Sequence, residues 1–368
     1  MADKKPEWVP EEDNDAFATT VMKGAVQPPP PSRQLRRRTL SIEEMERGVR
    51  ENNRTVLGQA ITLVESNAWK HQEKAQELIQ RLLPHTGTSI RIGITGVPGA
   101  GKSTFIEAFG TMLCEMGHRV AVLAVDPSST LTGGSILGDK TRMEQLIQQP
   151  NAFVRPSPSG GALGGVNRRT RETMLLCEAA GYDVILVETV GVGQSEGMVR
   201  DMVDFFLLLS LTGAGDELQG MKRGILELAD AILINKADGE NKLRALQTVS
   251  LYGQMSHLFQ PATDGWDVYV GICSALYKEG LREFWNIIRQ FSELTRASGA
   301  FGKRRNAQKR DWLYASIREQ LELRFFSNPL MKEQLPLVEQ NVAAGHQTVT
   351  SAVMRLMKQY EAGKVQDS

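Results

Sequence analysis

The chain has 368 residues, of which 41% are hydrophobic and 23% are charged, a composition typical of globular proteins. Its 43 basic and 43 acidic residues give a formal net charge of zero, which argues against a nucleic-acid or membrane-surface partner. The scattered cysteines, which form no CxxC pair, argue against a disulfide framework and a cysteine-rich zinc site; they are Cys114, Cys177 and Cys273. With no secretory signal and no apolar run long enough to span a bilayer, we expect a cytoplasmic protein.

The first 88 residues divide into two parts. Residues 1–40 carry acidic patches, four consecutive prolines and the basic run RQLRRR, so we expect a disordered tail in which the basic run is either solvated or a docking patch. Residues 41–88 form a helical region, which begins with a capping box from Ser41 to Glu44. Its expected breaks are Gly48, Asn52-Asn53 and Ser66-Asn67, and the sequence PHTG at 84–87 stops it.

Residues 89–295 show short apolar runs that alternate with amphipathic helical stretches. This pattern predicts an α/β domain with a doubly wound, mostly parallel sheet that is covered on both faces. The predicted strands are 90–95, 120–125, 184–188, 205–211, 231–235 and 268–272. No strand signal follows Ser292, and residues 296–368 are expected to form a helical C-terminal region. Within it, residues 303–361 are predicted to form three helices with breaks near 327–329 and 343–345.

The strongest motif is the run GVPGAGKS, which matches the P-loop pattern GxxxxGK[ST] between a predicted strand and a predicted helix. Its glycines let backbone N–H groups turn toward phosphates, Lys102 reaches the β and γ phosphates, and Ser103 is a ligand for Mg²⁺. The candidate phosphate-binding residues are Gly96, Val97, Pro98, Gly99, Ala100, Gly101, Lys102, Ser103 and Thr104.

A second motif follows the strand predicted at 231–235. Asn235, Lys236 and Asp238 form the pattern NKxD, in which the aspartate accepts hydrogen bonds from N1–H and the exocyclic amino group of guanine. Adenine lacks both donors and would leave a buried carboxylate unpaired, so this motif predicts GTP and GDP as ligands. The run Ser274-Ala275-Leu276 is similar to the loop that backs the guanine ring.

Acidic residues at two predicted strand ends are candidates to hold Mg²⁺, directly or through water. Asp126 and Glu188 occupy these positions, and Gly191 stands where its N–H can contact the γ-phosphate. Asp139 is a candidate to contact the metal or the attacking water. We identify no arginine that supplies an arginine finger within the chain, so intrinsic hydrolysis should be slow and open to acceleration by a partner.

The runs GITGVPGAGKST, AVDPSS, GDKTRM, ETVGVGQSE, GAGDELQGMKRGILELAD and INKAD resemble the MeaB/ArgK-type GTPases. The resemblance extends from about residue 41 to the C-terminus and implies a P-loop GTPase domain of the SIMIBI class. It also implies a client, methylmalonyl-CoA mutase or a related adenosylcobalamin-dependent acyl-CoA mutase. The GTPase then gates cofactor loading and protects or reactivates the mutase, with no cobalamin expected on the chain itself.

The resemblance further implies roles for single residues. Lys102, Ser103, Asp126, Asp139 and Glu188 form the phosphate–magnesium site, in which Lys102, Asp126 and Asp139 are the catalytic candidates. Three switch loops map to 126–142, 188–196 and 213–222. Gln219 and Lys222 in the third loop communicate with the mutase, and the C-terminal helices join a homodimer.

Two alternatives remain at this point. One is a phosphotransferase that acts on a transport protein or a small molecule, although no second substrate pocket or acceptor-activating base is evident in the sequence. The other is a metal-insertion GTPase, for which the dispersed cysteines and histidines offer no cluster.

Overall fold

The computed structural model describes residues 40–66, 68–125, 143–155, 163–189, 195–212, 223–256 and 260–366. Residues 41–368 form one unit by their internal contacts, and every element below belongs to it. Five of the predicted site residues lie outside the described residues: Asp126, Asp139, Gly191, Gln219 and Lys222.

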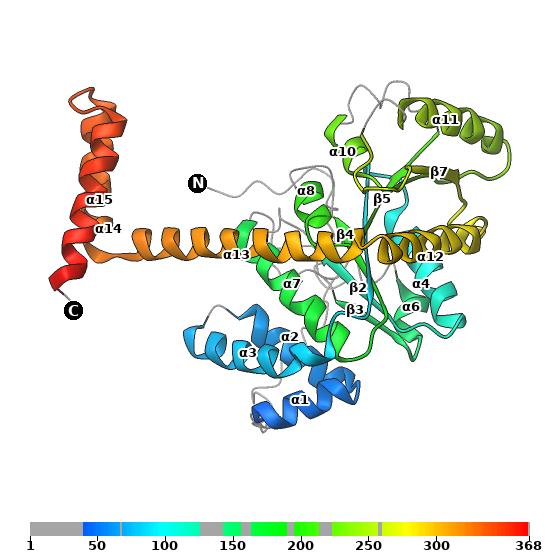
Figure 1. The fold of residues 1–368 in the computed structure, drawn as a ribbon, viewed down its shortest axis with the longest axis horizontal. Coiled ribbons are helices and arrows are strands. Elements are labelled where there is room, and N and C mark those ends of the chain that lie inside the picture. The colour runs from blue at the N-terminus through cyan, green and yellow to red at the C-terminus, as the bar shows by residue number, and fades with distance from the viewer. Residues whose placement is uncertain are drawn as a thin grey trace, which may run out of the picture. The chain divides into compact units, whose positions relative to one another are not determined.

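Seven strands within the described residues form one parallel sheet in the order β3-β2-β4-β1-β5-β6-β7 (Figure 1). The apolar side chains of the five inner strands are almost all buried, on both faces, which explains why the sequence shows continuous rather than alternating apolar runs there. The strands are β1 (Ile90–Gly96), β2 (Val120–Val125), β3 (Ala152–Arg155), β4 (Val184–Thr189), β5 (Phe205–Ser210), β6 (Ala231–Ile234) and β7 (Tyr269–Ile272).

The fold class and six of these strands confirm the prediction, but β3 was not predicted. It is a four-residue strand at the edge of the sheet, and only Ala152 in it is buried. Its apolar run, Ala152 to Val154, has only three residues and is shorter than the run of roughly four to eight that identifies a buried strand.

Helices cover both faces of the sheet. On one face, aromatic residues of α4 (Lys102–Glu115) and α12 (Leu281–Ala297) pack over β1, β4 and β5 in the largest apolar core. The other face is covered by α7 (Leu163–Ala179), α8 (Ser195–Arg200), α10 (Arg223–Leu228) and α11 (Asn241–Ser256). The short helix α6 (Glu144–Gln148) precedes β3. Figure 1 shows these helices around the twisted sheet.

Three N-terminal helices pack against one another and against α7: α1 (Ile42–Arg50), α2 (Arg54–Glu65) and α3 (Trp69–Leu82), followed by the 3₁₀ turn η1 (Leu83–His85). The capping box at Ser41 and the breaks near Asn53 and Ser66 are confirmed. The expected break at Gly48 is wrong, because Gly48 lies inside α1. A Cβ at Gly48 would lie 2.7 Å from Cγ1 of Val56, so the glycine allows close helix packing.

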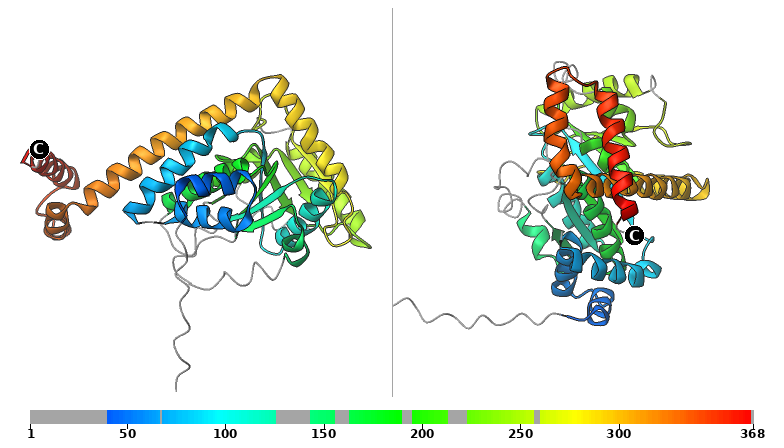
Figure 2. Two further views of the ribbon diagram at one scale, coloured as in Figure 1. Left: turned by 90° about the horizontal axis from the view of Figure 1, so that it is seen from below. Right: turned by 90° about the vertical axis from the view of Figure 1, so that its left-hand side faces the viewer.

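The C-terminal part contains the long helix α13 (Ala300–Ser327), then α14 (Pro329–Ala343) and α15 (Val349–Gln366). The predicted helix breaks near 328 and 344 are confirmed. The first part of α13 contacts α12 and α7, whereas α14 and α15 pair side by side at its far end (Figure 2). A small apolar cluster that includes Met331, Val338 and Leu356 joins these two helices.

Candidate nucleotide site

The P-loop joins the end of β1 to the start of α4. Gly96 and Gly101 have φ values of 155° and 85°, and Gly101 is the N-cap of α4. A Cβ at Gly96 would overlap the carbonyl oxygen of Leu209, and a Cβ at Gly101 would lie 2.8 Å from Nδ2 of Asn235. Glycine is therefore required at both positions, because a Cβ would meet a neighbouring atom and because the backbone has a positive φ.

The side chain of Lys102 folds back over the loop. Its Nζ donates hydrogen bonds to the carbonyl oxygens of Gly96 at 2.8 Å and Val97 at 3.3 Å. Burial lowers the pKa of the Lys102 ammonium group, while the charges of Glu188 and Glu196 oppose this shift. A partly desolvated cation at a helix N-terminus favours an anionic ligand such as a phosphate group.

Ser103 and Glu188 come together from different elements. Oγ of Ser103, in the first turn of α4, donates a hydrogen bond to Oε1 of Glu188, in β4, at 3.2 Å. Hydroxyl and carboxylate oxygens are the ligand types that Mg²⁺ prefers. Two of the three side chains that the sequence assigned to the metal therefore fit this ion. They lie beside Lys102, where Mg²⁺ bound to a nucleotide would be placed.

Residues 235–238, the base-reading loop predicted from the sequence, follow β6 and contact the P-loop directly. Nδ2 of Asn235 donates to the carbonyl oxygen of Ala100 at 2.8 Å, and Oδ1 of Asn235 accepts from the N–H of Ala275 at 3.0 Å. Asn235 is almost fully buried. This one side chain thus fixes the P-loop, the base-reading loop and the 274–276 loop relative to one another.

Asp238 is oriented by the 274–276 loop. Oγ of Ser274 donates to Oδ2 of Asp238 at 2.6 Å, and the N–H of Ala237 donates to the carbonyl oxygen of Cys273 at 3.0 Å. Lys236 adopts φ 58°, a left-handed conformation that is uncommon for a lysine. The structure therefore brings together the residues that the sequence assigned to guanine, although the side chain of Leu276 is 70% exposed.

Sequence reasoning missed several contacts at this edge of the sheet. Thr189 and Thr95, both buried, share a hydrogen bond between their hydroxyl groups at 3.0 Å, which ties the strand of Glu188 to the strand of the P-loop. Oγ1 of Thr212 donates to Oδ1 of Asn241 at 2.7 Å, and Nδ2 of Asn241 donates to the carbonyl oxygen of Lys236 at 2.7 Å. Threonine and asparagine are too common near loops for their types alone to predict these contacts.

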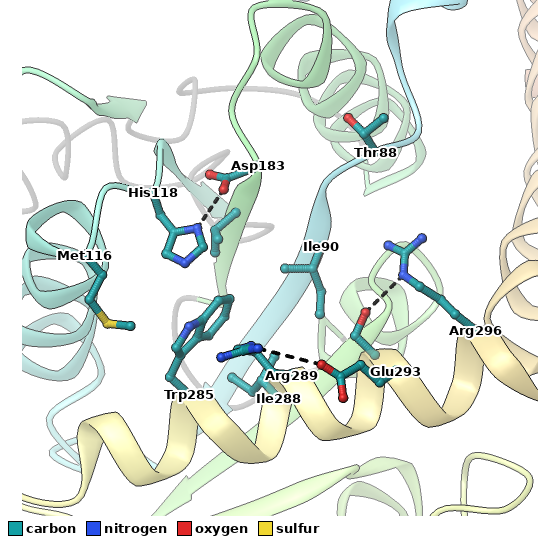
Figure 3. Close-up of a pocket in the computed structure, with 12 residues that line it drawn as sticks. Thr88, Ile90, Met116, His118, Asp183, Trp285, Ile288, Arg289, Glu293 and Arg296 are labelled. Atoms are coloured by element: carbon teal, nitrogen blue, oxygen red, sulfur yellow. Dashed lines mark hydrogen bonds and ion pairs between the residues drawn. The ribbon is translucent and has the colours of Figure 1, made fainter.

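A separate hollow of about 400 Å³ lies at the amino ends of β1 and β4, the end of the sheet opposite the P-loop (Figure 3). Ile90, Val184 and Ile288 provide apolar lining. At its edge, Nδ1 of His118 lies 2.6 Å from Oδ2 of Asp183. The hollow shares no lining residue with the candidate nucleotide site, so the two are distinct.

Among the described residues, no group of three or more His, Cys, Asp or Glu side chains is placed to hold a metal ion. No helix among them is both long and apolar enough to cross a membrane.

The parallel sheet carries a P-loop after β1 and an NKxD loop after β6, and a hydrogen bond joins the two loops. This is the arrangement of a P-loop GTPase. Residues 57–330 match the family model described as methylmalonyl Co-A mutase-associated GTPase MeaB. The chain belongs to this family.

Individual relatives agree with the assignment. The chain is 49% identical to GTPase ArgK of Escherichia coli over 288 residues, which cover 78% of this chain and 87% of that protein. It is 44% identical over 331 residues to the mouse protein named methylmalonic aciduria type A homolog, mitochondrial, covering 87% and 80% of the two chains. A crystal structure of a protein named LAO/AO transport system kinase is similar with a TM-score of 0.71 and 37% identity, covering 88% of this chain and 100% of that one.

Proposed function

We propose that this GTPase is a chaperone of methylmalonyl-CoA mutase or a related acyl-CoA mutase, in which GTP binding and hydrolysis gate adenosylcobalamin loading and protect or reactivate the mutase. The observation that supports the proposal is the link from Asn235 to Ala100, which sets the proposed guanine-binding loop against the P-loop in a chain of a mutase-associated family. The family description names methylmalonyl-CoA mutase, and we therefore propose this mutase or a related one as the client.

In the proposed reaction, water attacks the γ-phosphate of GTP. Lys102 and the backbone N–H groups of the P-loop stabilise the negative charge that develops on the transferring phosphoryl group. Ser103 and Glu188, together with Asp126, would hold Mg²⁺, which would supply positive charge to neutralise the phosphate oxygens. We assign Asp139 to the attacking water or the metal, and Gly191 to contact with the γ-phosphate.

We further propose that residues 296–368 form a dimerisation arm. One side of α13 exposes apolar side chains at helical spacing: Leu313, Ile317 and Leu321 are 58%, 45% and 55% exposed. Residues four apart lie on the same face of a helix, so these three form a stripe that a second helix can cover. Sedimentation equilibrium tests this assignment: the wild type should be a dimer, and Ile317→Glu should yield monomers. A wild type that sediments as a monomer would remove the dimerisation arm from the proposal.

The test of the chaperone proposal is GTP hydrolysis by the purified chain, alone and with an adenosylcobalamin-dependent acyl-CoA mutase from the same source. We expect slow hydrolysis alone and acceleration of several-fold or more with the mutase. Lys222→Ala should bind GTP normally but respond less to the mutase, because Lys222 belongs to the proposed communication loop. Hydrolysis that is indifferent to the mutase would remove the client from the proposal.

A second candidate is a phosphotransferase, because the similar crystal structure is that of a protein named a transport system kinase. The two candidates differ in the fate of the γ-phosphate. With γ-labelled GTP, the GTPase proposal expects all label in inorganic phosphate. Label on a transport protein or on another acceptor would favour the phosphotransferase.

A further inference from the structure

The side chain of Asn241 joins separate segments at the edge of the sheet that carries the P-loop. Asn241 is the first residue of α11 and follows the base-reading loop closely. Its Nδ2 donates to the carbonyl oxygen of Lys236 at 2.7 Å, and its Oδ1 accepts from Oγ1 of Thr212 at 2.7 Å. Thr212 lies just beyond β5, the neighbour of β6 in the sheet. One amide therefore links the end of β5, the base-reading loop and the start of α11.

An asparagine at the start of a helix more often serves the helix itself. At the N-cap position its side-chain oxygen accepts from N–H groups of the first turn. Here the two polar groups of the Asn241 side chain are bonded to residues outside α11. The main-chain N–H of Asn241 donates to the carbonyl oxygen of Asp238 at 3.0 Å, so the turn into the helix is closed by the backbone. The side chain therefore serves the base-reading loop rather than α11.

The residue that Asn241 holds has a strained backbone. Lys236 has a φ of 58°, in the left-handed region that costs free energy for a residue with a Cβ. Such a conformation persists only where the surrounding structure holds it. The peptide group that follows Lys236 is bonded at both ends: its carbonyl oxygen accepts from Asn241, and its N–H, that of Ala237, donates to the carbonyl oxygen of Cys273 at 3.0 Å.

This peptide group controls the direction of the next residue. Because a peptide unit is planar and rigid, a rotation that moves the carbonyl group of Lys236 also moves the N–H of Ala237. Ala237 is buried and directly precedes Asp238, whose carboxylate we assign to N1–H and the amino group of guanine. Loss of the bond from Asn241 should therefore turn the carboxylate away from the base.

Thr212 sets the orientation of the Asn241 amide. An asparagine side chain carries an acceptor and a donor on opposite sides, and only the nitrogen can bond to a carbonyl group. Because Oδ1 accepts from the hydroxyl group of Thr212, Nδ2 is turned toward Lys236. Thr212 and Asn241 are both half-buried, so their hydrogen bond is partly shielded from water.

We propose that Asn241 is a positioning residue for the choice of base. Oriented by Thr212, its amide holds the carbonyl group of Lys236 and thereby keeps Asp238 in the direction that accepts from guanine. Asn241 acts through the loop and needs no contact with the nucleotide. The inference rests on the proposed function, in which the base-reading loop binds guanine.

The test measures dissociation constants for GDP and inosine diphosphate (IDP) in the full-length wild type, Asn241→Ala and Asn241→Asp. Inosine lacks the amino group of guanine, so the ratio of the IDP to the GDP constant reports how well Asp238 is directed at the base. The aspartate variant keeps the shape and the acceptor for Thr212, but a carboxylate oxygen then faces the carbonyl group of Lys236. Asn286→Ala is the matched control, because Asn286 is an exposed asparagine on α12.

Both Asn241 variants should lower this ratio by about three-fold or more, the low end of what one hydrogen bond contributes, and the control should not change it. A merely structural role gives a different result. A carboxylate in the first turn of a helix interacts favourably with the helix dipole, so Asn241→Asp should not weaken α11, and its charge acts on both nucleotides alike. Wild-type ratios in the two variants would overturn the proposal.

Variants of Thr212 test the same link from its other end. Thr212→Val removes the hydroxyl group and should lower the ratio in the same direction as the Asn241 variants. Thr212→Ser keeps the hydroxyl group and should retain the wild-type ratio. If the valine variant retained the ratio as well, the amide of Asn241 would not need Thr212, and that part of the proposal would fail.

A double-mutant comparison separates this inference from the function on which it rests. If Asn241 acts through Asp238, then Asn241→Ala should weaken GDP binding in the wild type but have little further effect in Asp238→Ala. An equal loss in both backgrounds would contradict the proposal and leave the guanine site intact. A wild type that binds GDP and IDP equally would instead overturn the assignment of guanine to the base-reading loop.

Discussion

Nδ2 of Asn235 and the carbonyl oxygen of Ala100 are joined by a hydrogen bond of 2.8 Å, although the two residues are 135 positions apart in the chain. The bond places the loop that we assign to the guanine base against the P-loop. Gly101 of the P-loop lies at this contact, and a Cβ there would lie 2.8 Å from the same Nδ2. The proposed base and phosphate sites therefore share one contact.

Gly101→Ala should weaken binding of both GTP and GDP by roughly ten-fold or more, since displacement of the Asn235 amide costs about the energy of one hydrogen bond and ten-fold corresponds to about 1.4 kcal/mol. Gly99→Ala is the matched control: Gly99 also has a positive φ, 82°, but a Cβ there meets no atom within 4 Å. Calorimetric titration with GDP measures both. Equal losses in the two variants would show that backbone strain, not the contact with Asn235, is responsible.

Asp238→Asn should shift preference from guanine toward xanthine nucleotides, because the carboxylate that accepts from N1–H and the amino group becomes an amide. We expect GTP affinity to fall by about 100-fold or more, as is usual when a buried polar pair is mismatched. Competition between GTP and xanthosine triphosphate measures the shift.

Ser274→Ala is a milder change at the same site, to be compared with Asp238→Asn. It removes the hydroxyl group that donates to Oδ2 of Asp238 at 2.6 Å but leaves the carboxylate in place. It should weaken GTP binding by a smaller factor and leave the preference for guanine over xanthine intact. Unchanged GTP affinity in Asp238→Asn would contradict the assignment of the base-reading loop.

The sheet and the P-loop were predictable because their signals are local. Continuous apolar runs identify buried parallel strands, and GVPGAGKS and NKAD are fixed patterns at strand ends. Strand β3 was not predictable, because its apolar run of three residues, Ala152 to Val154, is too short to identify a strand. The hydrogen bonds of the Gln308 side chain to the carbonyl oxygens of Arg200 and Val203 join residues more than 100 positions apart, and a glutamine in a helix carries no signal of its partner.

The three thiols of the chain should not react with Ellman's reagent at pH 8 in the folded protein, and all three should react after denaturation. All are buried, and burial raises the pKa of Cys114 to about 11 and that of Cys273 to about 12; it also raises the pKa of Cys177. The thiolate is the reactive form, so at pH 8 the folded protein offers almost none. Rapid reaction of one equivalent without denaturant would show that a thiol becomes accessible by local opening.

Arg305→Ala should lower the free energy of unfolding by about 3–5 kcal/mol, because it leaves the carboxylate of Asp204 buried without its paired guanidinium group. In the wild type, this guanidinium group binds both carboxylate oxygens of Asp204, at 2.7 and 2.6 Å. Asp204 is 1% exposed, and the N–H of Arg91, which donates to its Oδ2 at 2.9 Å, does not replace the lost positive charge. Urea denaturation followed by circular dichroism measures the loss.

Arg310→Ala, on the same helix, is the control for that measurement. Arg310 and its ion-pair partner Asp311 are both exposed, and such surface pairs contribute about 0–1 kcal/mol. The difference between the two variants therefore isolates the buried pair from any general effect of removing an arginine from α13. If Arg305→Ala were no more destabilising than Arg310→Ala, then Asp204 would be satisfied without Arg305. In that case α13 would not be anchored to the sheet by this pair.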